Sequence, residues 1–223
     1  MARRAKARRG RCVACAEIAV GIAATKVVAL QFCLASMKIR PATEADRDAI
    51  WNIFRQVVVA ADTYALDPNM SHEDALAYWF APATHTYVAE VDAEFRGEAV
   101  PFPRTPTPSP IAGASLVIVG TYILRPNQAG GGSHVANAAF MVSASARGRG
   151  IGRAMAEHCL SEARRLGFRA MQFNFVISTN TPAIRLWQDL GFNIVGTLPG
   201  AFHHPETGYL DVYVMHRSLL EIS

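Results

Sequence analysis

The segment from Arg147 to Arg153 combines glycine and arginine at a spacing suited to binding a polyphosphate. It has the sequence RGRGIGR and lies between an expected strand and an expected helix. Glycine lets backbone N–H groups approach a phosphate closely, and a helix N-terminus adds a favourable dipole. The sequence therefore predicts an anion site formed by Arg147, Gly148, Arg149, Gly150, Ile151, Gly152 and Arg153.

Neither of two common phosphate-binding motifs describes this segment. A dinucleotide-binding fingerprint needs G-x-G-x-x-G, and the last position counted from Gly148 is Arg153. A P-loop needs Lys-Ser or Lys-Thr after its final glycine, whereas Gly152 is followed by Arg-Ala. The alternative to an anion site is an ordinary glycine-rich turn before a helix.

Asn137 and Asn174 are polar residues of two expected strands, in an otherwise apolar setting of Phe140, Phe173 and Phe175. A buried amide needs hydrogen-bonding partners. Paired across neighbouring strands, the two amides would grip the carboxylate or the amine of a small amino acid; alternatively, they satisfy backbone groups. His134 is the nearest titratable side chain and is either a general base or part of a surface turn. The following residues are expected at the rim of the site that would hold this small molecule, here called the acceptor site: Tyr64, Tyr122, His203, His204 and Tyr209.

The elements that must position these residues form an α+β domain. Helices are expected over 44–60, 72–80, 150–166 and 182–190, and strands over 38–40, 86–91, 114–124, 136–142, 171–176, 192–195 and 210–217. Thr43-x-x-Asp46 and Ser71-x-x-Asp74 supply N-caps for the first two helices. The element order predicts a single mixed, mostly antiparallel sheet with helices on both faces. The residues before the last strand, from Gly200 on, are expected to form a loop over the acceptor site.

Charge and cysteine content narrow the function classes. The net charge of +4 arises in residues 1–36, which hold seven basic residues and one acid, so the body carries 15 basic and 17 acidic residues. No nucleic-acid or membrane partner is therefore expected. Cys12-x-x-Cys15 lacks a second pair, and His203-His204 has only Glu206 nearby, so no metal site is expected. The absence of a disulfide framework favours a cytoplasmic location.

Residues 1–36 are expected to stand apart from the domain. They are basic and then apolar, like a signal peptide or short anchor, but Glu17 and Lys26 interrupt the apolar run. Because Met37 opens a segment suited to a first strand and helix, residues 1–36 are expected to be a non-functional extension or a misassigned start. The domain then covers 37–223, with a proline-rich loop inserted at about 92–112.

Two motifs resemble those of the GNAT (GCN5-related) N-acetyltransferases. Arg147-x-x-Gly150-x-Gly152, after a strand, is similar to the R/Q-x-x-G-x-G/A motif of that family. Asn180-x-x-Ala183-x-x-Leu186-Trp187-x-x-x-Gly191-Phe192 is similar to the family's second signature, N-x-x-A-x-x-L-Y-x-x-x-G-F. Both motifs stand in the expected order, and the resemblance extends over about 37–220.

The resemblance implies acetyl-CoA as co-substrate and a GNAT-type sheet whose fourth and fifth strands splay apart. The pantetheine arm would lie in the splay against Phe140, Met141 and Val142, with Asn180 and Ala183 on its other side. Arg147–Arg153 would bind the pyrophosphate. Backbone N–H groups near Met141 would hold the developing oxyanion.

The chain departs from the family at two catalytic positions. Trp187 stands where many members have a tyrosine acid, and its indole N–H cannot serve as a general acid. It is expected to pack on the cofactor or to hydrogen-bond to its sulfur, with water delivering the proton. The strand around Asn137 also lacks the glutamate that many members use as a base. Asn137 and the run from Asn174 to Asn180 resemble fungal N-acetyltransferases that act on proline analogues such as azetidine-2-carboxylate. That resemblance implies that Asn137 and Asn174 bind the acceptor and that catalysis proceeds mainly by positioning.

The sequence therefore predicts acetyl transfer from acetyl-CoA to the amine of a small metabolite, amino acid or toxic amino-acid analogue. Acetylation of protein N-termini or lysines is one alternative, because acceptors vary within one fold. A non-catalytic CoA-binding regulator is another, since the usual acid and base are missing. A homodimer is left open by the sequence.

Overall fold

The computed structural model describes residues 37–60, 62–92 and 116–220. The predicted extension 1–36 lies outside the described residues, and so does the proline-rich insertion from residue 93 on. Within these residues there are seven strands: β1 (Lys38–Pro41), β2 (His85–Asp92), β3 (Leu116–Pro126), β4 (Val135–Val142), β5 (Ala170–Ile177), β6 (Asn193–His204) and β7 (Gly208–Ser218). The α-helices are α2 (Arg47–Val59), α3 (His72–Trp79), α4 (Ile151–Arg165) and α5 (Thr181–Asp189), with short 3-10 turns at Glu44–Asp46, Gly130–Gly132 and Ala144–Ala146.

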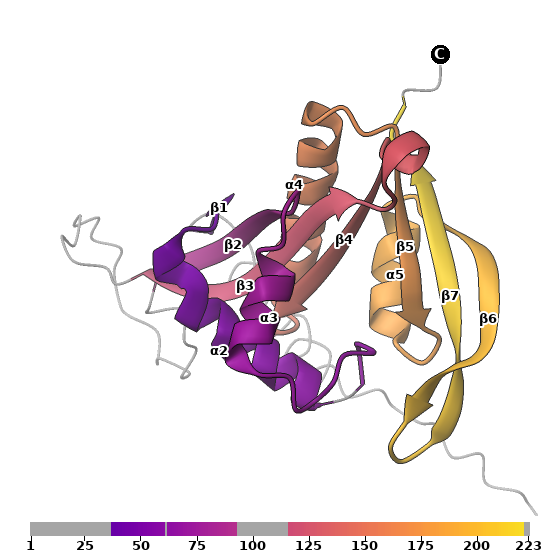
Figure 1. The fold of residues 1–223 in the computed structure, drawn as a ribbon, viewed down its shortest axis with the longest axis horizontal. Coiled ribbons are helices and arrows are strands. Elements are labelled where there is room, and N and C mark those ends of the chain that lie inside the picture. The colour runs from indigo at the N-terminus through magenta and orange to yellow at the C-terminus, as the bar shows by residue number, and fades with distance from the viewer. Residues whose placement is uncertain (1–36, 61, 93–115, 221–223) are drawn as a thin grey trace, which may run out of the picture.

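The strands form one sheet in the order β1-β2-β3-β4-β5-β7-β6 (Figure 1). Every neighbouring pair is antiparallel except β4 and β5, which run parallel. These two strands pair only where they begin, at Val135 with Ala170 and Ala136 with Met171. Beyond Ala136 they diverge, which confirms the splay that the family resemblance implies. The fold class is as predicted: a single α+β domain with a mixed, mostly antiparallel sheet.

Helices cover both faces of the sheet, also as predicted (Figure 1). On one face, α2 and α3 pack in a core that includes Phe54 and Met141. On the other, α4 and α5 pack in a core that includes Met155, Phe173 and Trp187. Because side chains alternate along a strand, consecutive residues of β4 point to opposite faces of the sheet, and so do those of β5 up to the register shift after Phe173. This alternation decides which site residues can meet.

The predicted N-terminal caps are present. Asp46 accepts hydrogen bonds from the backbone N–H and the hydroxyl of Thr43, at 2.7 and 2.9 Å, and closes a capping box before α2. The Ser71 hydroxyl accepts from the Asp74 N–H at 3.1 Å and caps α3. Capping thus fixes the starts of α2 and α3, and the cap at Ser71 also marks the end of the connection that carries Tyr64.

The predicted loop from Gly200 onward is wrong. β6 continues to His204 and forms a hairpin with β7, where the expected strand was only 192–195. The register shifts between Leu198 and Phe202, so Pro199 lies in an irregular stretch of an edge strand, where proline is tolerated. Gly200 has φ +58 there, and its N–H donates to Asp211 at 2.9 Å. Signals typical of a loop therefore mark a bulge inside a strand.

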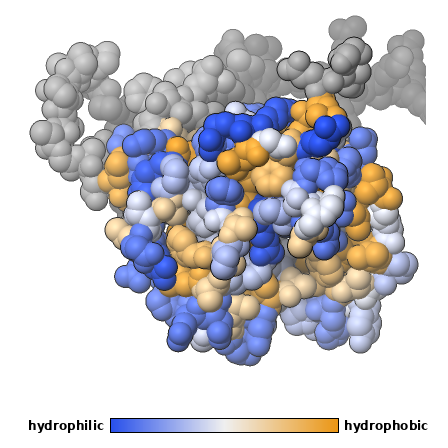
Figure 2. Space-filling view, turned by 45° about the horizontal axis from the view of Figure 1, so that its top comes forward, coloured by the Kyte–Doolittle hydropathy of each residue, from blue (hydrophilic) through white to orange (hydrophobic). Residues whose placement is uncertain are grey.

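On the face that Figure 2 shows, apolar and polar residues are interspersed. Of the described residues, none belongs to a helix long and apolar enough to span a membrane.

Candidate active site

Two of the three glycines of the predicted anion site, Gly148 and Gly150, adopt the backbone conformation that favours glycine. Gly148 has φ +75 and Gly150 has φ +80, and Gly150 is the N-cap of the 15-residue helix α4. The segment therefore turns sharply from β4 into α4 and presents the positive end of the helix dipole. A Cβ at Gly152 would have its nearest neighbour in Leu186, at 4.0 Å, so the surface beside the helix start is open. This backbone fits a pyrophosphate.

The charged and apolar members of this segment have different surroundings. Arg147 is exposed and Arg149 is half-buried. Arg153 forms an ion pair with Asp189 of α5, with the Nη2–Oδ2 distance at 2.7 Å. Ile151 is only 1% exposed, so its side chain belongs to the core and only its N–H is available to a ligand. The segment thus presents backbone N–H donors and arginine side chains to an anion, and the buried Ile151 side chain anchors the segment in the core.

The edge of β4 at Phe140 is the central feature of the splay. The Tyr64 hydroxyl accepts from the Phe140 N–H at 2.9 Å and donates to the Phe140 carbonyl at 2.8 Å. Because an N–H makes one linear bond, the Phe140 N–H points away from β3 and into the gap between β4 and β5. Backbone groups alternate in direction, so those of Met141 face β3. Of the two backbone N–H groups, that of Phe140 is therefore the one that points into the splay.

The two predicted acceptor asparagines do not contact each other. The Asn137 Nδ2 donates to the carbonyl of Gln172 at 2.8 Å. The Gln172 Nε2 donates to Asn174 Oδ1 at 2.8 Å, and the Asn174 Nδ2 donates to Asn127 Oδ1 at 2.6 Å. A chain of amides thus crosses the splay, with Gln172 as the link.

The setting of these amides differs from the expectation in two ways. Asn174 is exposed and Asn137 is half-buried, so the predicted buried pair is wrong. Phe140 and Phe173 belong to the core under α4 and α5, whereas the asparagines alternate with them and lie on the other face of the sheet. The amides therefore face the α2 and α3 side, which is also the side of Tyr64.

Trp187 packs within an aromatic cluster. It is 9% exposed, and its ring centroid lies 5.1 Å from Phe140 and 4.6 Å from Phe173. In the second motif, the Asn180 side chain accepts from the Ala183 N–H at 3.2 Å and caps α5. This motif thus builds the wall of the splay beneath Phe140.

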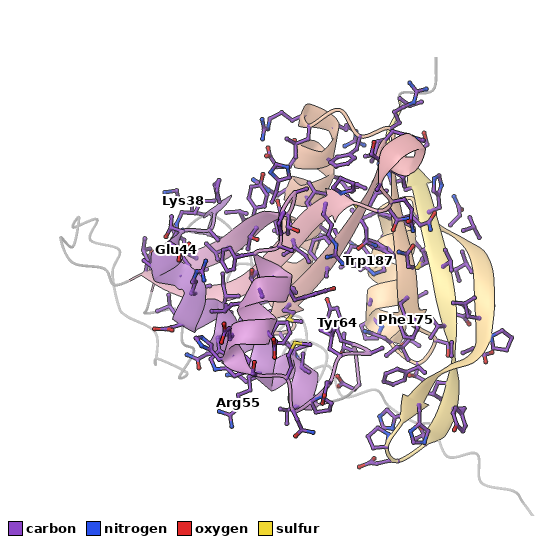
Figure 3. The ribbon with its side chains drawn as sticks, viewed as in Figure 1. Lys38, Glu44, Arg55, Tyr64, Phe175 and Trp187 are labelled. Carbon is purple, nitrogen blue, oxygen red and sulfur yellow. The ribbon has the colours of Figure 1, made fainter. Side chains whose placement is uncertain are left out.

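A cavity of about 350 Å³ adjoins the splay on the α2 and α3 side. It lies between the α2–α3 connection and the β6–β7 hairpin and is lined by Tyr64, Ala65, Leu66, Pro68, Ala201, Phe202, His203 and Pro205. Tyr64 belongs both to this lining and to the β4 edge (Figure 3). Tyr64 therefore links the cavity to the edge of β4.

The predicted rim residues divide into three groups. Tyr64 and His203 line the cavity, and Tyr209 packs against His203 with the ring centroids 4.9 Å apart. The His204 Nδ1 accepts from two backbone N–H groups and holds the hairpin turn. Tyr122 is wrongly placed by the prediction, because it is fully buried under α4 with its hydroxyl 2.6 Å from His158 Nδ1.

His134 belongs to a surface turn. Its Nδ1 lies 3.1 Å from the Gly131 carbonyl, in an exposed position before β4. Phe140 is six residues further along the extended chain, about 20 Å away. His134 is therefore not the base of the splay, and its other interpretation is confirmed.

Sequence reasoning missed Gln172 and Asn127. Gln172 precedes Asn174 by two residues in the same strand, so strand periodicity places both on one face and was a usable signal. Asn127 follows β3 and reaches Asn174 from 47 residues away, and nothing in the local sequence indicates that contact.

Comparison with known proteins agrees with this geometry. A model of the acetyltransferase (GNAT) family matches residues 51–192. N-acetyltransferase aca1 from Schizosaccharomyces pombe is 34% identical over 153 residues, which cover 68% of this chain and 70% of that protein. The structure of a GCN5-related N-acetyltransferase from Kribbella flavida is similar, with 43% identity, a TM-score of 0.69, and coverage of 82% of this chain and 98% of that one.

A more distant structure shares the fold. It is a phosphinothricin acetyltransferase from Sinorhizobium meliloti in complex with acetyl-CoA, 22% identical with a TM-score of 0.63, covering 82% of this chain and 88% of that one. Fold, splay and motifs together define an acyltransferase, and the chain belongs to the GNAT acetyltransferase family. Acetyl-CoA is the co-substrate of this enzyme.

Proposed function

We propose that the enzyme acetylates the amine of a small metabolite, amino acid or toxic amino-acid analogue, in the cytoplasm. The observation that carries this proposal is the juxtaposition of the Phe140 N–H, the amides of Asn137 and Asn174, and an open cavity lined by Tyr64. The cavity volume of about 350 Å³ suits a small molecule. The S. pombe relative, itself an N-acetyltransferase, supports the same class of reaction.

The donor would bind along β4 and the start of α4. Acetyl-CoA supplies an activated acetyl group as a thioester. The N–H groups and arginines of Arg147–Arg153 would hold its pyrophosphate, and the edge of β4 at Phe140 and Val142 would pair with the pantetheine arm. The Phe140 N–H would then donate to the thioester oxygen, where negative charge develops during attack.

The acceptor would lie on the opposite side of that thioester, against the amide chain. The amides of Asn137 and Asn174 donate and accept hydrogen bonds without carrying charge, so they can orient a carboxylate or an amine. We infer that positioning of a neutral amine beside the thioester supplies most of the rate. As the C–N bond forms and the C–S bond breaks, the amine would lose its proton to water and the leaving thiolate of CoA would take a proton from water, because the indole N–H of Trp187 cannot serve as a general acid.

The test is a mass-spectrometric screen of amines, amino acids and proline analogues incubated with the enzyme and acetyl-CoA. We expect acetylated small molecules, and we expect Asn174→Ala to lose acceptor selectivity while keeping its affinity for acetyl-CoA. Asn52→Ala, on an exposed position of α2, is the control and should behave as wild type. Acetylation of peptides alone, or unchanged kinetics in Asn174→Ala, would contradict the proposal.

We also propose that the enzyme is a homodimer. Strand β6 is an edge of the sheet and exposes Ile194, Val195 and Leu198, with 39, 59 and 43% of each residue accessible. An exposed apolar edge strand favours pairing with another chain. Light scattering at micromolar concentration should give the mass of two chains, and the mass of one chain would contradict the proposal.

A further inference from the structure

Tyr64 satisfies both backbone groups of one residue at the site of the reaction. Its hydroxyl accepts from the Phe140 N–H at 2.9 Å and donates to the Phe140 carbonyl at 2.8 Å. Burial raises the pKa of this hydroxyl above its ordinary value, while the bond from Phe140 opposes that shift. The phenol is therefore neutral at physiological pH and keeps the proton that it donates.

The two bonds occupy the position that a thioester needs. The Phe140 N–H makes one linear hydrogen bond, so a thioester oxygen can accept it only after the Tyr64 oxygen has left. The Phe140 carbonyl has two lone pairs and can accept from a pantetheine N–H as well, so the competition concerns the N–H. We propose that Tyr64 competes with acetyl-CoA for Phe140 and that binding of acetyl-CoA displaces the phenol. This inference rests on the proposed placement of the pantetheine arm in the splay.

Displacement of the phenol links the donor site to the acceptor cavity. Tyr64 is part of the α2–α3 connection and lines the cavity beside Leu66 and His203. A turn at Asp67, whose carboxylate accepts from the Asn69 N–H at 2.8 Å, follows it in the chain. The displaced ring therefore remains next to the cavity and changes its shape. Acetyl-CoA is thus expected to bind before the acceptor.

Tyr64→Phe tests the competition because it removes the hydroxyl and keeps the ring. A neutral hydrogen bond contributes about a factor of 2 to 12 in an equilibrium constant. Tyr64→Phe removes two such bonds from the free enzyme and none from the complex, in which the phenol is already displaced. Because water replaces part of the lost bonds, we expect acetyl-CoA to bind about tenfold more tightly to the variant. Isothermal titration calorimetry with acetyl-CoA measures this change. An unchanged affinity would overturn the inference, and a weaker one would indicate that the hydroxyl binds the donor.

Two controls separate this inference from the proposed function. Phosphoadenosine diphosphate, the nucleotide half of coenzyme A, lacks the pantetheine arm, so its affinity should be the same for Tyr64→Phe and wild type. The Tyr87 hydroxyl donates to Glu162 on the face of the sheet that α4 covers. Tyr87→Phe removes this hydroxyl and should leave the affinity for acetyl-CoA unchanged. Gly150→Val places a side chain at φ +80 and should weaken both ligands more than tenfold. If Gly150→Val binds both normally, the proposed donor site is wrong, whatever Tyr64→Phe does.

Hydrogen exchange measures the contact itself. In the free enzyme the Phe140 amide should exchange about tenfold faster in Tyr64→Phe than in wild type, because its acceptor has been removed. Acetyl-CoA should restore protection in both proteins. Equal exchange rates in the two free proteins would mean that the Tyr64 hydroxyl does not hold Phe140.

Discussion

Asp46→Asn probes the contact that fixes the start of α2, on the face of the sheet that α2 and α3 cover. The Asp46 carboxylate accepts from Arg40 Nη1 and Nη2 at 2.7 and 2.9 Å, as well as from the N–H and hydroxyl of Thr43. It is only 5% exposed. The hydrogen bonds from Arg40 are the largest cause that lowers the pKa of Asp46 from 3.8 to about 2, although burial opposes them.

The size of the effect follows from that pKa. A carboxylate whose pKa is lowered from 3.8 to about 2 in the folded state contributes about 2 kcal/mol to the free energy of unfolding at neutral pH. Because the folded pKa is the lower one, this stabilisation is complete above about pH 4 and is lost as the pH falls through about 2. The difference between wild type and Asp46→Asn should therefore disappear over that window.

Urea unfolding from pH 7 to pH 2, followed by circular dichroism, measures this difference. Asp48→Asn is the matched control, since its side chain is 95% exposed in the first turn of the same helix. We expect its free energy of unfolding to lie within about 0.5 kcal/mol of wild type. The reasoning is refuted if Asp46→Asn is no more destabilised than Asp48→Asn, or if its deficit does not change with pH.

Two further substitutions test the packing around the splay. Trp187→Phe should keep the acetylation rate within about threefold, because the indole packs on Phe140 and does not act as an acid; a hundredfold loss of rate with unchanged acetyl-CoA affinity would assign it a chemical role. Gly120→Ala should lower the free energy of unfolding by about 1–3 kcal/mol, because the new Cβ would lie 2.9 Å from Met155 Cε and 3.3 Å from the Met141 carbonyl. Gly131→Ala, with no atom within 4 Å of the new Cβ, is its control for stability.

Local patterns in the sequence predicted the parts of the site that local geometry determines. The positive φ angles of Gly148 and Gly150 explain why glycine occupies those positions, and the start of α4 follows directly. The capping box between Thr43 and Asp46 is equally local, because its two residues are three positions apart. In both places the residues that contact each other are also close together in the sequence, so a local pattern is enough to predict the contact.

The parts that the sequence did not reveal depend on contacts between distant residues. Tyr64 meets Phe140 across 76 residues, and Asn174 meets Asn127 across 47. The length of β6 was underestimated because Pro199 and Gly200 are typical of loops, and only pairing with β7 keeps them in an edge strand. The register of strand pairing decides which face of the sheet a polar residue occupies. A single sequence shows that side chains alternate every two residues, but it does not show the register.

The most direct test of the account is a crystal structure of the enzyme with acetyl-CoA. We expect the pantetheine arm between β4 and β5, the thioester oxygen within hydrogen-bonding distance of the Phe140 N–H, and the Tyr64 hydroxyl displaced toward the cavity. The pyrophosphate should lie at the start of α4, beside Gly150. Acetyl-CoA bound outside the splay, or bound there while Tyr64 still holds Phe140, would contradict the central claim.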